Sequence, residues 1–161
     1  MTAKISISIK HQSLSFYSSL QDNLHFKISS AINGAGQRKN SNQTPLGKHI
    51  VRAKIGGECQ KFSVFEGRRF TGEIWSPDFE QQSPRSDWIL SRVIWLSGQE
   101  IGFNRLGDVD TMQRYIYIHG TNEENLLGQP SSHGCIRMAN DDVMQLFDLI
   151  KVGDQVNINE A

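Results

Sequence analysis

The stretch YIYIHGTNEENLLGQPSSHGCIRM, residues 115–138, carries the pattern that decides the interpretation of this chain. An alternating apolar segment ends at His119, a polar loop follows, and His133 and Cys135 then come two residues apart. A free thiol is only a few per cent ionised at neutral pH, and a nearby imidazole can take its proton. The stretch therefore predicts a strand that ends in a histidine and a loop that returns the chain to a cysteine.

The residue types alone leave three interpretations open. Cys135 can be a nucleophile with His119 as its base, His119, His133 and Cys135 can be three zinc ligands, or the cluster can be purely structural. The zinc signatures HExxH, paired CxxC and HxE…PCxxC do not occur. Gly134 permits unusual backbone angles, so that the amides of Gly134 and Cys135 can face a developing oxyanion. The residues favour the nucleophile without excluding the other two interpretations.

Composition limits the class of protein and its partners. A chain of 161 residues suits a single domain spanning residues 1–161. Apolar residues make up 37% and charged residues 21%, and 17 Lys and Arg balance 17 Asp and Glu. Nucleic acids and acidic membrane surfaces require clustered positive charge, so we expect neither as a partner.

The N-terminus and the cysteines bear on the compartment. Serines interrupt the apolar residues of MTAKISISIKHQSLSFYSS, so the run required by a secretory signal is missing. No run of 18 apolar residues predicts a membrane span. We therefore expect a cytoplasmic protein in which Cys59 and Cys135 stay reduced, with Cys59 a structural thiol.

Alternation with a period of two predicts strands along most of the chain. The segments are KISISIK (4–10), SLSFY (13–17), LHFKIS (24–29), HIVRAKIGG (49–57), WILSRVIWLSG (88–98), EIGFN (100–104), YIYIH (115–119) and QVNI (155–158). We expect the first three to form an antiparallel meander, and 88–98 and 100–104 to form a hairpin. The result is a mainly β fold, a sandwich or barrel, with one or two helices.

Two other segments stand apart from the strands. In ANDDVMQLFDLIKVGD (139–154), apolar residues recur at helical spacing, and Asn140 is suited to cap the N-terminus. Residues 67–87 are polar and irregular, with Pro77 and Pro84. Long irregular segments often cover functional sites, so we expect 67–87 to form a lid-like excursion.

The string SSHGCIRM with the upstream IHG resembles the signature of the L,D-transpeptidase catalytic domain family. TPLG, residues 44–47, resembles an upstream element of the same family, and the helix after IRM with the closing VGDQVNI resembles its C-terminal end. The likeness extends over nearly the whole chain, and only the polar region near 67–87 does not align.

This resemblance implies a mixed β-sheet fold and a role for each residue of the motif. It implies that Cys135 attacks, that His119 is the base, and that the carbonyl of Gly120 orients the imidazole. His133 and Gly134 would shape the site, and amides around Cys135 would form the oxyanion hole. Ser132 and Arg137 would support the loop or bind substrate. No metal and no organic cofactor is implied.

The resemblance also implies peptidoglycan stem peptides as substrates. The family cleaves the bond between the third residue and a terminal D-alanine and keeps the tripeptide as a thioester. An amine of a second stem then forms a 3→3 crosslink, or water completes an L,D-carboxypeptidation. Arg137 or Arg114 would anchor the terminal carboxylate.

The second half of that reaction depends on the compartment. Because no signal or anchor is visible, we expect a cytoplasmic L,D-carboxypeptidase that trims soluble muropeptides during murein recycling. An L,D-transpeptidase is the alternative, and a non-catalytic muropeptide-binding module is a minor one.

Overall fold

A computed structural model describes residues 3–85 and 87–161 of the chain. Its strands are β1 (Lys4–Ser8), β2 (Ser13–Tyr17), β3 (Leu24–Ser29), β4 (Gly47–Ile55), β5 (Ser63–Glu66), β6 (Arg69–Ile74), β7 (Ile89–Gly98), β8 (Tyr117–Gly120), β9 (Ile136–Met138) and β10 (Gln155–Asn159). Its helices are α1 (Pro77–Gln82) and α2 (Asn140–Leu149), with short 3₁₀ turns at Gly107–Val109 and Glu124–Leu126. None of the helices in these ranges is long and apolar enough to cross a membrane.

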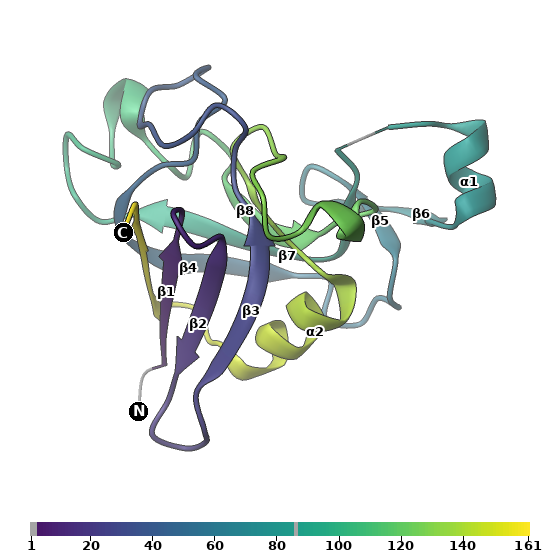
Figure 1. Cartoon of the computed structure of the whole chain (residues 1–161), viewed down its shortest axis with the longest axis horizontal. Helices are drawn as coiled ribbons and strands as arrows, with labels where there is room; N and C mark the ends of the chain where they lie inside the picture. The colour runs from purple at the N-terminus through teal and green to yellow at the C-terminus, as the bar shows by residue number, and fades with distance from the viewer. Residues whose placement is uncertain (1–2, 86) are drawn as a thin grey trace.

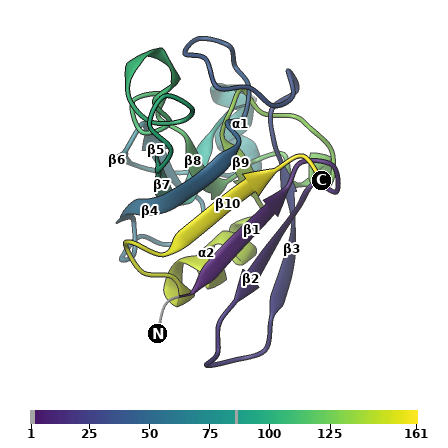
Figure 2. The same cartoon turned by 90° about the vertical axis from the view of Figure 1, so that its left-hand side faces the viewer.

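Eight of the strands close into a barrel. They follow the order β4, β10, β1, β2, β3, β9, β8 and β7, and β4 also pairs with β7 (Figures 1 and 2). The pairs β1–β10 and β8–β9 are parallel, and the other pairs are antiparallel. The mainly β, mixed-sheet fold predicted from the sequence is confirmed, as is the β1–β2–β3 meander.

The core follows from the alternation seen in the sequence. In β1, Ile5 and Ile7 point inward while the flanking polar residues face outward. Helix α2 turns Val143 and Leu146 into the same core and packs against β7 and β8. Helix α2 therefore supports β8, the strand that carries His119, from the core side.

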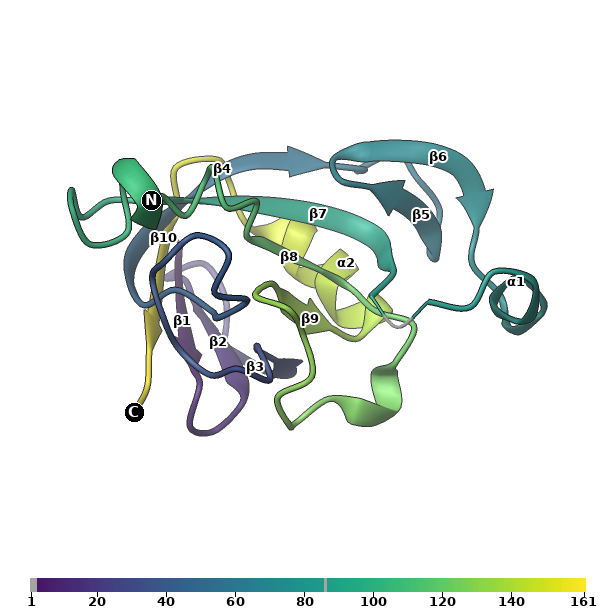
Figure 3. The same cartoon turned by 90° about the horizontal axis from the view of Figure 1, so that it is seen from above.

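The polar segment near 67–87 is more ordered than its composition suggested. β5 and β6 form a hairpin that is attached to β7, and α1 follows (Figure 3). Ser76 caps α1, because its Oγ accepts the amide hydrogen of Phe79. The segment projects from the barrel and returns to it at β7, beside the end of β8 (Figure 1).

Two local predictions were wrong. Residues 100–104 do not form a strand, because the carbonyl of Glu100 accepts the amides of Phe103, Asn104 and Arg105 and closes a tight turn. The edges of β7 are instead occupied by β4, β5 and β8. Asn140 does not cap α2 but is its first residue, and its backbone amide donates to the Glu124 carboxylate at 2.7 Å.

Candidate active site

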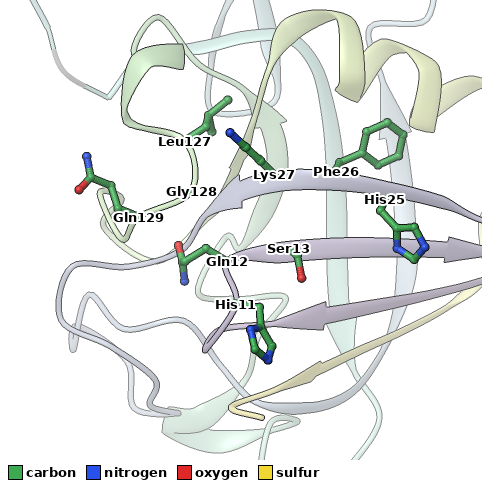
Figure 4. A pocket seen from close by; sticks show the side chains of 9 residues that line it. All are labelled: His11, Gln12, Ser13, His25, Phe26, Lys27, Leu127, Gly128 and Gln129. Atoms are coloured by element: carbon green, nitrogen blue, oxygen red, sulfur yellow. The ribbon is translucent and has the colours of Figure 1, made fainter.

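A hollow of about 110 Å³ lies beside Cys135, where β8 and β9 run parallel. It is lined by Asp87, Ile89, His119, Ser132, His133, Cys135 and Arg137. A larger hollow, of about 640 Å³, lies on the outer face of β2 and β3 (Figure 4). It is lined by His11, His25 and Lys27 but by no cysteine, so the proposed nucleophile lines the smaller hollow.

His119 is the penultimate residue of β8 and is buried, at 3% exposure. Its Nδ1 lies 2.7 Å from the carbonyl oxygen of Gly120. A carbonyl oxygen can only accept, so Nδ1 carries the ring hydrogen and Nε2 keeps its lone pair. Burial lowers the pKa of His119 to about 4, which the Gly120 bond opposes and the charge of Arg137 reinforces. The ring is therefore neutral at pH 7, with Nε2 able to accept a proton.

The thiol of Cys135 lies between two backbone groups, those of Tyr115 and Tyr117, in the segment that leads into β8. Sγ accepts the amide hydrogen of Tyr117 at 3.3 Å and points its own hydrogen toward the carbonyl of Tyr115 at 3.5 Å. Burial raises the pKa of Cys135 to about 11, although the Tyr117 amide and the charges of Arg137 and Arg114 favour the thiolate. The thiol of Cys135 and the imidazole of His119, which line the same hollow, are therefore both neutral at rest.

The turn that presents Cys135 is closed by Ser132. Ser132 Oγ donates to the carbonyl of Cys135 at 2.6 Å and accepts the amide hydrogen of Gly134 at 3.2 Å. Gly134 has φ +133°, a conformation that side chains disfavour. We expected the backbone amide of Gly134 to be free to face an oxyanion. In the structure this amide donates to Ser132 Oγ instead. The amide of Cys135 remains the proposed donor.

Arg137 lies under the same turn and is only 2% exposed. Its Nη1 donates to the Glu123 carboxylate at 3.0 Å and to Ser131 Oγ at 3.2 Å. A buried arginine needs such partners, because an unpaired buried charge is strongly destabilising. The guanidinium therefore binds the loop between the two histidines, and Arg137 also lines the hollow. Its part in binding a substrate carboxylate stays a prediction.

Arg114 is likewise committed to the protein. It donates to the carbonyls of Gly36, Gln37 and Gln43 and to Ser41 Oγ. The polar loop before β4 is therefore tied to the segment entering β8. Arg114 holds this loop, and a role for it in anchoring a substrate carboxylate stays a prediction.

The TPLG element contacts the catalytic turn directly. Thr44 Oγ1 donates to the carbonyl of Gly134 at 2.9 Å and accepts the amide hydrogen of Ala31 at 3.0 Å. Thr44 is fully buried. This upstream element therefore fixes the backbone next to Cys135.

The structure brings the predicted residues together around one hollow, with Gly120 behind His119 and Gly134 inside the turn. His133 is exposed and reaches the hollow from its rim. Sequence reasoning did not identify the Tyr117 amide, Asp87 or Ile89. Within residues 3–85 and 87–161, no three His, Cys, Asp or Glu side chains are grouped to hold a metal ion. Both cysteines carry free thiols.

Comparison with known proteins gives one consistent family. The family model for the L,D-transpeptidase catalytic domain, YkuD, matches residues 2–158. A relative in Bacillus subtilis, the putative L,D-transpeptidase YqjB, is 46% identical over 65 residues, which are 40% of this chain and 35% of the relative. The putative L,D-transpeptidase YkuD of Bacillus licheniformis is 46% identical over 77 residues, 48% of this chain and 45% of the relative. The matches thus span less than half the length of these relatives.

Solved structures show the same fold at low sequence identity. An L,D-transpeptidase from Mycobacterium smegmatis aligns with TM-score 0.61 and 17% identity over 98% of this chain and 58% of that one. L,D-transpeptidase 3 from Mycobacterium tuberculosis aligns with TM-score 0.59 and 15% identity over 99% of this chain and 61% of that one. At such identities the likeness concerns the fold.

Proposed function

The chain belongs to the L,D-transpeptidase catalytic domain family, and we propose that it acts on peptidoglycan stem peptides through an acyl-enzyme at Cys135. One observation carries the proposal. The Gly120 carbonyl fixes the tautomer of His119, so that a neutral base lines the same hollow as a partly buried thiol. This is the arrangement that an activated cysteine nucleophile requires.

In the proposed acylation, Sγ of Cys135 attacks the carbonyl carbon of the third stem residue while Nε2 of His119 takes the thiol proton. The Tyr117 amide stabilises the sulfur as charge develops, and the Cys135 amide faces the carbonyl oxygen. The bond to D-alanine then breaks, and the imidazolium gives its proton to the leaving amine. D-Alanine departs and the tripeptide remains as a thioester.

The second step transfers the acyl group to an amine or to water. The acceptor forms a bond to the acyl carbon as the C–S bond breaks, and its proton returns through His119 to the thiolate. A second hollow, of about 210 Å³, meets the first at His133. It is lined by Lys39, Asn40, Asn42, Gln113, Arg114, Tyr115, Ile116 and His133. Two hollows that share His133 would let a donor and an acceptor approach Cys135 from two sides, so 3→3 crosslinking is the first candidate.

L,D-Carboxypeptidation is the second candidate. The side chain of Asp87, at the rim of the Cys135 hollow, is about half exposed at 48%, so water reaches the site from this side. In this second candidate the substrates are soluble muropeptides and the protein is cytoplasmic, which is the expectation drawn from the sequence. Cell fractionation of the native protein tests the location, and a periplasmic or wall-bound protein would contradict it. Closure of the excursion near 67–87 over the hollow remains a prediction.

The deciding experiment incubates the protein with a purified tetrapeptide muropeptide and resolves the products by mass spectrometry. We expect D-alanine release and a tripeptide adduct on Cys135. Cys135→Ala should show neither, while Cys59→Ala should keep most of the activity. Crosslinked dimers as the main product support transpeptidation, and free tripeptide supports carboxypeptidation. Turnover by Cys135→Ala would refute the acyl-enzyme, and binding without turnover by the unmodified protein would indicate a binding module.

A further inference from the structure

Asp87 places a carboxylate at the edge of the Cys135 hollow. It is the last residue of the excursion and lies two positions before β7 begins. Among the described residues that line this hollow, Asp87 is the acidic one, and it lies with Ile89 on the wall formed by the start of β7. A substrate that enters the hollow therefore meets one fixed negative charge near the thiol.

The partner of Asp87 in the protein is weakly held. Arg85 Nε lies 3.3 Å from Asp87 Oδ1, and both side chains are about half exposed. Exposed pairs of this kind contribute little, because water and salt screen them. The Arg85 guanidinium also lies over the Trp88 ring, at 4.5 Å from its centroid. Arg85 can therefore stay stacked on Trp88 while another cation binds the Asp87 carboxylate.

The backbone around Asp87 is anchored on both sides. Glu80 of α1 accepts the indole hydrogen of Trp88 at 2.6 Å and the amide hydrogen of Arg85 at 3.4 Å. Asn122, which follows β8, donates to the Arg85 carbonyl at 3.0 Å and to Glu80 at 3.3 Å. The excursion is therefore tied to the segment that follows His119, through Arg85 and the Trp88 side chain on either side of Asp87.

The charge of Asp87 acts on both reacting groups. Burial is the main cause that raises the pKa of Cys135, and the carboxylate of Asp87 adds to it. The same carboxylate opposes the lowering of the His119 pKa by burial. A cation bound at Asp87 would offset this charge and make the thiolate easier to form.

We propose that Asp87 binds a primary ammonium group of the stem peptide and thereby determines which substrates are accepted at Cys135. The inference rests on the proposed function. The complementary partner of a rim carboxylate is an aliphatic cation, and the reaction supplies one in the amine that forms the 3→3 crosslink. That ammonium belongs either to the side chain of the third residue in the donor or to the second, acceptor stem. Asp87 forms no covalent bond in either case.

The first test measures binding, so that it does not depend on turnover. In a Cys135→Ala background, tetrapeptide with a free side-chain amine on its third residue is compared with the same peptide N-acetylated at that amine. We expect acetylation to weaken binding roughly 2- to 5-fold, because an ion pair with a half-exposed carboxylate is screened by water and salt. Adding Asp87→Asn should remove the difference, and Asp87→Glu should restore part of it. Asp78→Asn, an exposed carboxylate on the same excursion that does not line the hollow, should change nothing.

The second test separates the two sources of the ammonium group. With an N-acetylated donor and a free-amine acceptor stem, Asp87→Asn should raise the acceptor concentration for half-maximal crosslinking if the acceptor is the source. With donor alone, it should raise KM for D-alanine release, with kcat little changed, if the donor is the source. Equal effects of acetylation with and without Asp87 in every arm would overturn the proposal. Failure of the proposed function is a different result, namely no D-alanine release by the unmodified protein from either peptide.

Discussion

The backbone amide of Tyr117 lies 3.3 Å from Sγ of Cys135, so a main-chain hydrogen bond is directed at the proposed nucleophile. The contact arises because β8 and β9 are parallel, with Ile118 opposite Ile136, which brings the preceding residues of the two strands alongside each other. A backbone donor cannot be lost by a side-chain substitution, and it costs no ordering when charge develops on sulfur. The thiol is nevertheless held protonated by burial.

This balance predicts the pH dependence of thiol modification. In Cys59→Ala, where Cys135 is the remaining thiol, the rate of alkylation by iodoacetamide should rise about tenfold per pH unit above neutrality, because the thiolate reacts. The rate should level off only near the raised pKa of about 11. Mass spectrometry at timed intervals measures it, with circular dichroism to check that the fold persists. A plateau below pH 9 would show a resting thiolate and contradict the neutral pair.

Substitution of the two histidines should separate their roles. His119→Ala should slow acylation by roughly 10² to 10⁴, the usual range for loss of a general base. His133→Ala should have a smaller effect, because His133 is exposed at the rim shared by the two hollows. Stopped-flow detection of D-alanine in a single turnover gives both rates. The assignment fails if His133→Ala is the slower of the two.

Gly134→Ala should damage the site more than the fold. At φ +133° a side chain is strained, and a Cβ there would lie 3.3 Å from Ile116 and 3.5 Å from the Gln43 carbonyl. The turn must shift, so we expect at least a tenfold loss of kcat/KM and a destabilisation of about 1–3 kcal/mol. Gly67→Ala is the matched control, since Gly67 also has positive φ but open space around it. Comparable activity in the two variants would show that the turn tolerates the side chain.

The sequence predicted what depends on local pattern. Alternating Ile5 and Ile7 gave β1, and helical spacing in 140–149 gave α2, because burial on one face selects those periods. The prediction was wrong for residues 100–104, which form a turn despite their β-like composition. The edges of β7 are already paired with β4 and β8. Which strand pairs with which is a long-range choice that period alone does not encode.

The same distinction applies to the site. The motif predicted Cys135 and His119 because chemistry requires particular side chains, and these are visible in the sequence. The Tyr117 amide and the Asp87 carboxylate escaped notice, since their place depends on strand register and on the Glu80 contacts of the excursion. Arg114 was expected, as an alternative to Arg137, to anchor a substrate carboxylate, and its hydrogen bonds to the loop before β4 could not be predicted from the sequence.

A last prediction concerns stability in acid, through a histidine outside the proposed mechanism. His49 on β4 is 1% exposed, with Nδ1 3.0 Å from the Gly47 carbonyl and Nε2 2.9 Å from Thr111 Oγ1. Burial lowers its pKa to about 4, against the Gly47 bond and the charge of Glu100, while Arg114 adds to the lowering. His119 is lowered to a similar value.

The sign follows from proton uptake. Between about pH 4 and 6.5 both imidazoles are neutral in the folded chain but largely protonated in the unfolded one, so unfolding takes up protons. Stability is therefore complete above pH 6.5 and falls as the pH drops toward 4, by on the order of 3 kcal/mol for each histidine. Urea unfolding at pH 7.5, 5.5 and 4.5 should show the fall. The fall should be about half as large in His49→Gln and unchanged in His11→Gln, which alters an exposed histidine. An equal fall in His49→Gln would mean that His49 is protonated in the folded chain or that other groups dominate the acid response.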